Sequence, residues 1–148
     1  MAGRAEWALG DELQDELRDL LSLAVVGDHV RRVLKRDEHG EFAHWLVDAT
    51  GQWREWSDQV AKRLITLGVA PDGRVRSLVK DVPINWVPDG WIQLNEAQQL
   101  IGDRLNQLAG WALDRRVHTT DPETLHLLSM LSSGLATQAA TLQSSRSR

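Results

Sequence analysis

Five polar side chains between positions 41 and 68 have types and spacings that could support metal chemistry. They are His44, Asp48, Glu55, Asp58 and Lys62. If the segment is a helix, side chains at these positions lie roughly along one side of it. Helix bundles build metal sites from imidazoles and carboxylates, and ferrous iron binds nitrogen and oxygen ligands. The row therefore indicates either a metal site or a solvated helix face, and its spacing alone leaves both open.

A helix that could position this row is predicted by the apolar residues of the same segment. They recur every three or four positions: Phe42, Trp45, Leu46, Ala49, Trp53, Trp56, Val60, Leu64 and Leu67. This is the period of an amphipathic helix with one wide buried face. Gly68, with Pro71 and Gly73 just beyond it, predicts where the helix ends.

Three further segments are predicted to be helical. Residues 10–36 have apolar periodicity, acidic first turns and basic last turns, and these charges complement the helix dipole. A third helix is expected to begin near Asn95, with Gln98 at capping-box spacing. A fourth is expected to begin after Asp121 as its N-cap, with Pro122 in the first helical position.

The connection over residues 69–94 is too long for a hairpin between neighbouring helices. It contains RVRSLVKD, which could form two turns of helix. The predicted fold is therefore all-α: an antiparallel four-helix bundle with a long second-to-third crossover that contains a short helix. The bundle is expected to span residues 10–143, after an N-terminal arm (1–9) and before a polar tail (144–148).

Composition limits the classes of function. The chain of 148 residues, 42% apolar and 26% charged, fits one globular domain. The absence of cysteine excludes disulfides and thiolate metal sites. No signal-like start and no membrane-spanning apolar run occur, so a cytoplasmic protein without membrane contact is expected. The net charge of −4 argues against binding nucleic acid through the overall field, and the seven tryptophans could be core or subunit contacts.

Two segments resemble motifs of the Dps proteins, the ferritin-like DNA-protecting proteins of starved bacteria. Residues 58–68, DQVAKRLITLG, resemble the D-x-x-A-E-R-x-x-x-L-G-G segment of that family. Residues 121–128, DPETLHLL, resemble the D-P-x-T-x-x-L-L start of its last helix. The resemblance implies a dodecameric shell built from dimers. Such shells oxidise ferrous iron, store the ferric product and in many members coat DNA.

The resemblance also implies an iron site between two subunits, but the matching ligands here are incomplete. Asp58 matches the aspartate of the family, whereas Lys62 stands where the family has a bridging glutamate. When the two sequences are aligned without gaps from Asp58, Ala43 occupies the position of the family's second-helix histidine. Only a slip of one residue brings in His44, which is followed by Asp48 at the expected spacing.

On the first helix, the matching histidine position is Arg31, and the nearest histidine is His29. Lys62 and Arg31 are cations that cannot ligate iron while protonated, and Lys62 is expected to pair with Asp58 one turn away. We therefore expect a degraded ferroxidase site whose remains are Asp58, His44, Asp48 and His29. Whether the chain is still an enzyme stays open.

Other polar residues have two readings each. Arg146 and Arg148 could give weak, salt-sensitive contacts with DNA when displayed many times on a shell, or the tail could only aid solubility. Asp114, Asp121 and Glu123 could line an iron-entry pore, or cap helices. The expected function is iron sequestration and protection against oxidative or starvation stress in bacteria. The alternative is a non-enzymatic, dimeric four-helix module for interaction or small-ligand binding.

Overall fold

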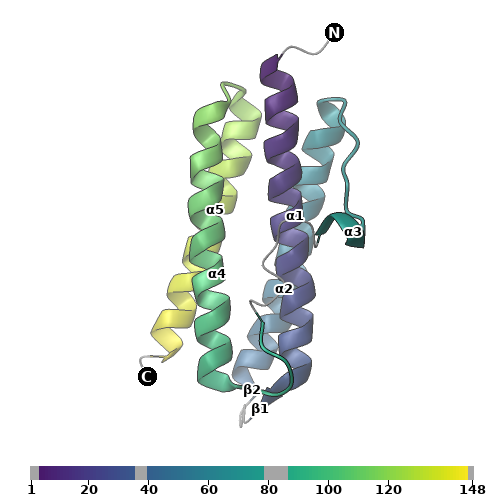
Figure 1. Cartoon of the computed structure of the whole chain (residues 1–148). Helices are drawn as coiled ribbons and strands as arrows, with labels where there is room; N and C mark the ends of the chain where they lie inside the picture. Colours follow the sequence, from purple (N-terminus) through teal and green to yellow (C-terminus); the bar gives the residue numbers. More distant parts are fainter. Residues whose placement is uncertain (1–3, 36–39, 79–86, 147–148) are drawn as a thin grey trace.

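Four long helices form the molecule, which is described by a computed structural model over residues 4–35, 40–78 and 87–146. The helices are α1 (Arg4–Val33), α2 (Glu41–Thr66), α4 (Leu94–Arg115) and α5 (Pro122–Arg146). The short helix α3 (Val75–Leu78) lies on the connection from α2 to α4, beside α1 and α2 (Figure 1). The predicted all-α four-helix bundle with a helix in its crossover is confirmed.

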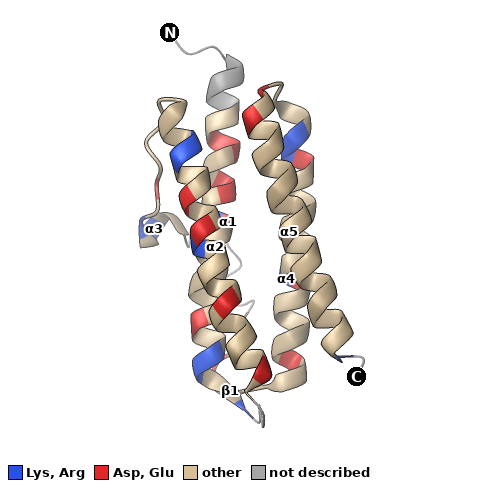
Figure 2. Cartoon of the chain, turned by 180° about the vertical axis from the view of Figure 1, so that it is seen from behind, with Lys and Arg blue, Asp and Glu red and all other residues tan. Residues whose placement is uncertain are grey.

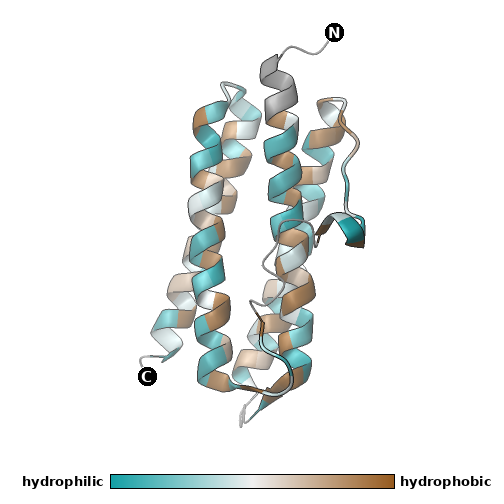
Figure 3. Cartoon of the chain, in the orientation of Figure 1, coloured by the Kyte–Doolittle hydropathy of each residue, from teal (hydrophilic) through white to brown (hydrophobic). Residues whose placement is uncertain are grey.

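The bundle consists of two antiparallel hairpins, one of α1 with α2 and the other of α4 with α5. Helices α2 and α4 run in the same direction (Figure 1). Hydrophobic and hydrophilic positions alternate along each long helix (Figure 3). The apolar stripes meet in one shared core.

Two very short strands join the hairpins at one end. Strand β1 (Leu34–Lys35) pairs in parallel with β2 (Ile92–Gln93), in the register Leu34 to Ile92. Ile92 is buried there, so the pairing closes the end of the core. Neither strand was predicted from the sequence, because two residues are too few to show a period of two.

Several helix ends differ from those expected. Helix α1 begins at Arg4, so the described part of the predicted arm is helical, and Leu9 is already buried. Helix α5 continues to Arg146. The capping box at Asn95 is wrong: Gln93 is the N-cap, and Asn95 only accepts a hydrogen bond from the Glu96 N–H. Extended backbone at Gln93, where β2 ends, moves the N-cap two residues earlier than the polar residues suggested.

The buried face of α2 agrees with the predicted stripe. Seven of the nine apolar residues are buried, while Trp45 and Leu67 are half-buried. Trp53 is fully buried, and its indole N–H donates to Gln138 Oε1 on α5 at 2.8 Å. A Cβ at Gly27 would lie 2.7 Å from the Trp53 ring, so this glycine lets α1 approach α2 closely. Among the described residues, no helix is both long and apolar enough to cross a membrane.

Candidate functional site

The predicted polar row lies on the exposed side of α2. His44, Asp48, Glu55, Asp58 and Lys62 are all exposed. Charged positions follow one another along this helix in the view from behind (Figure 2). None of these five side chains forms an ion pair with another described residue. The expected pair between Asp58 and Lys62 is therefore absent, and both side chains face solvent.

The neighbouring part of α1 carries the two first-helix candidates, and an ion pair joins this part of α1 to α2. His29 is exposed and Arg31 is half-buried, and neither has a hydrogen-bond partner in the described part of the chain. An ion pair crosses the hairpin from α2 to α1, with Arg54 Nη2 at 2.5 Å from Asp28 Oδ2. Arg54 was missed, although its position four residues before Asp58 places it on the same side of α2.

These residues do not fit a complete iron site within one subunit. Over the described residues, no group of three or more His, Asp or Glu side chains is arranged to hold a metal ion. Arg31, Arg54 and Lys62 are cations that repel a divalent metal and have no lone pair to offer it. The candidates His44, Asp48, Asp58 and His29 are thus present on the surface but do not converge in this chain.

The best-defined polar cluster joins the two segments that resemble Dps motifs. Arg63, near the end of α2, donates from Nε to Thr124 Oγ1 at 3.1 Å and from Nη1 to Glu123 Oε2 at 2.6 Å. Its Nη2 pairs with Asp121. The Arg63 side chain is only 13% exposed and Thr124 is fully buried. The first segment therefore binds the second through one guanidinium.

Asp121 in this cluster is the predicted N-cap of α5. Its Oδ2 accepts a hydrogen bond from the Thr124 backbone N–H at 3.2 Å. The Thr124 hydroxyl and the Arg63 guanidinium together hold the pKa of Asp121 below its usual range. Asp121 and Glu123 are thus committed to capping and ion pairing, which supports that reading over the pore. Asp114 is exposed and pairs with no described residue.

A second cluster, between α1 and α4, was missed by the sequence analysis. Arg115 Nη1 pairs with Glu16 and, at 2.8 Å, with Asp19. Glu16 is 1% exposed; burial raises its pKa to about 7, and Arg115 opposes this shift without cancelling it. Burial likewise raises the pKa of Asp19, again against Arg115. The signal was the register of Glu16, which falls within the apolar stripe of Leu13, Leu17 and Leu20 rather than beside it.

The candidate DNA contacts are only partly described. Arg146 is exposed at the end of α5, where its Nη1 donates to Gln99 Oε1 at 2.5 Å. Arg148 lies outside the described residues. The role of both in binding DNA stays a prediction.

The arrangement of the helices is that of a ferritin-like four-helix bundle. Among solved structures, the fold is similar to those of Dps proteins. Dps92 from Deinococcus radiodurans superposes with a TM-score of 0.90 at 17% identity, over 96% of this chain and 87% of that one. Antigen TpF1 from Treponema pallidum gives 0.89 at 17% identity, over 97% and 94%.

A third similar structure is the Vibrio cholerae Dps protein, described as one of the ferritin-like diiron-carboxylate proteins. It gives a TM-score of 0.86 at 17% identity, over 95% of this chain and 89% of that one. No family model and no curated protein matches the sequence. The chain therefore has the Dps-like, ferritin-like fold that the two motifs implied, at very low sequence identity.

Proposed function

We propose that the chain is a Dps-like subunit that assembles with copies of itself into a shell and sequesters iron. Its role would be protection against oxidative or starvation stress, with ferrous iron oxidation that is weak or altered. The observation that carries this proposal is the likeness of the fold to solved Dps structures across nearly the whole chain. The exposed side of α2, which carries the polar row, is available for a contact between subunits.

The chemistry of the row supports altered oxidation. Iron is the substrate and cargo of such a shell, and it needs anionic oxygen ligands to offset its charge. Asp58 supplies one carboxylate, and His44, Asp48 and His29 are the remaining candidates. Arg31 and Lys62 stand where the resemblance implies iron ligands, so their positive charge is expected to weaken iron binding there.

Native mass tests the assembly directly. A mass near twelve times the 16.6 kDa of one chain supports the shell, whereas a stable dimer would contradict it and favour the non-enzymatic interaction module. The measurement is light scattering coupled to size exclusion at two protein concentrations. Both hypotheses predict self-association, so a monomer at both concentrations would contradict both.

Iron loading with hydrogen peroxide, followed by ferric absorbance, tests the activity. Turnover is expected to be well below that of a Dps protein with the full ligand set, and comparable turnover would contradict a degraded site. Lys62→Glu restores the carboxylate and removes a cation, so it should increase iron binding. Lys35→Glu makes the same charge change at an exposed position of β1 and should not. Equal effects of the two variants would mean that net charge, rather than the site, controls iron uptake.

A further inference from the structure

A pocket of about 670 Å³ lies between α1 and the crossover, and it is lined by basic side chains. The lining residues are Gln14, Arg18, Asp72, Arg74, Arg76 and Ser77. Three of the six are arginines, and Asp72 is the one acid among them. In a chain with a net charge of −4, this gathering of positive charge at a concave surface calls for an explanation.

The crossover wall of the pocket is fixed to α1 by paired hydrogen bonds. The Gln14 amide donates from Nε2 to the Asp72 carbonyl at 2.6 Å, and its Oε1 accepts from the Asp72 N–H at 2.8 Å. Further along, the Ser22 hydroxyl donates to the Leu78 carbonyl at 3.3 Å. Because the wall is anchored before α3 at Asp72 and again at Leu78, the last residue of α3, a ligand would find the pocket largely preorganised.

The Asp72 carboxylate is already fully engaged by its own loop. It accepts from Arg74 N at 3.1 Å, Nε at 2.9 Å and Nη2 at 3.0 Å, and from the Ser77 hydroxyl at 2.6 Å. The hydrogen bonds from Arg74 and Ser77 hold the pKa of Asp72 well below its usual range. Asp72 therefore stays ionised and pairs with Arg74. Its negative charge is not paired with Arg18 or Arg76.

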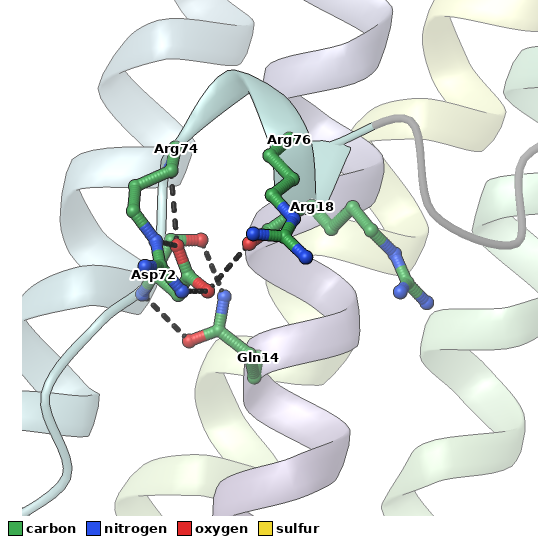
Figure 4. Close-up of a pocket in the computed structure, with 6 residues that line it drawn as sticks. Gln14, Arg18, Asp72, Arg74 and Arg76 are labelled. Carbon is green, nitrogen blue, oxygen red and sulfur yellow. Dashed lines mark hydrogen bonds and ion pairs between the residues drawn. The ribbon is translucent and has the colours of Figure 1, made fainter.

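Arg18 and Arg76 keep unused donors at the pocket. Toward the described residues, Arg18 donates from Nη2 alone, to Asp15 Oδ1 at 2.9 Å. Arg76 is exposed and has no hydrogen bond or ion pair to any other residue that the structure describes. In the close-up, Arg76 lies between Arg74 and Arg18, which come from the crossover and from α1 (Figure 4). Arginines from two elements thus line one pocket: Arg74 and Arg76 come from the crossover, and the Arg18 guanidinium of α1 extends away from them in this view.

We propose that this pocket binds a phosphate group, carried by inorganic phosphate or by a small phosphate ester. A guanidinium presents a planar fork that matches two phosphate oxygens, and a phosphate has enough oxygens to accept from more than one fork. The volume exceeds that of one phosphate ion, so there is room for the organic part of an ester. The proposal does not depend on iron or on shell assembly.

Calorimetric titration of the full-length protein with inorganic phosphate tests the site, at an ionic strength held constant with chloride. We expect saturable binding at one site per chain. Arg76→Ala should weaken it about tenfold or more, since a charge-assisted hydrogen bond is lost. Arg32→Ala is the matched control, because Arg32 is an exposed arginine of α1 that does not line the pocket. Far-UV circular dichroism verifies that both variants fold.

Two further titrants distinguish the source of the phosphate. Tighter binding of a nucleoside monophosphate would identify an ester as the ligand, whereas equal affinity would identify the phosphate group alone; either supports the proposal. Acetate should compete poorly, because a single carboxylate fills one fork only. No saturable binding by either phosphate, equal affinities of the Arg76→Ala and Arg32→Ala variants, or acetate competing as well as phosphate would overturn it.

Discussion

Lys62 and Arg63 are adjacent basic residues of α2, yet their surroundings are opposite. Arg63 is 13% exposed and is bound by three acceptors from the start of α5. Lys62 is exposed, and its side chain pairs with no residue that the structure describes. The resemblance to Dps at these two positions therefore extends to the contacts that hold the fold together, but not to the residues that would bind iron. Arg63 matches the arginine of the Dps motif and joins α2 to the start of α5. Lys62 stands in place of the motif glutamate, on which iron chemistry would depend.

Removing Arg63 is expected to have the largest effect. Arg63→Ala removes one hydrogen bond to the buried Thr124 hydroxyl and the ion pairs with Asp121 and Glu123, so the free energy of unfolding should fall by about 1.5–3 kcal/mol. Lys62→Ala, its neighbour, should change it by less than about 0.5 kcal/mol. Urea denaturation measures both. Equal losses in the two variants would remove the distinction between these residues.

The Arg115 cluster extends the comparison to a cation with buried acids. The pKa of Glu16 is raised from 4.5 to about 7, so the folded state keeps a proton that the unfolded state releases. The stabilisation is complete below pH 4.5 and is lost as pH rises through 7, a change of at most about 3 kcal/mol. Glu16→Gln should show a smaller loss, because Asp19, whose pKa is also raised by burial, still contributes. Parallel urea curves of both proteins between pH 5 and 8 measure it, and identical pH slopes would contradict it.

Two glycines report on the two sides of α2, with smaller effects. Gly27→Ala places a methyl group 2.7 Å from the Trp53 ring and should destabilise the bundle by about 1–3 kcal/mol. Gly51 lies on the exposed side, and a Cβ there would meet nothing within 4 Å. Gly51→Ala should therefore stabilise the helix by about 0.5–1 kcal/mol. Thermal unfolding compares them, and a destabilising Gly51→Ala would show that the exposed side packs against another subunit.

Much of the fold could be predicted because its information is local. The apolar period of α2, the Asp121–Pro122 start of α5 and the stop at Gly68 (φ 80°) depend on residues within a turn or two. The partners of Arg63 could not be predicted in this way, because they lie about 60 positions further along the chain. A motif shows that a residue type recurs, but not what it contacts.

The candidate site was harder to predict from the sequence for a related reason. The spacing placed His44, Asp48, Asp58 and Lys62 on one side of a helix, and the structure agrees that they are exposed together. Their ability to bind iron depends on what faces them, and the period of one helix cannot supply that. Arg54 illustrates the limit, since only the hairpin shows that it reaches Asp28 on α1.

The arrangement of short-range hairpins and long-range cross-links has a consequence for how the chain folds. The links through Arg63 and Arg115 and the pairing of Leu34 with Ile92 join residues 58 to 99 positions apart. Such contacts close long loops, so chain entropy is lost before the contacts stabilise the fold. Each hairpin, in contrast, can form from residues that are nearby in the sequence. We expect the two hairpins to form early and to dock late. Arg63→Ala should then act mainly by accelerating unfolding, and a slowed refolding rate in stopped-flow experiments would instead place this link in the transition state.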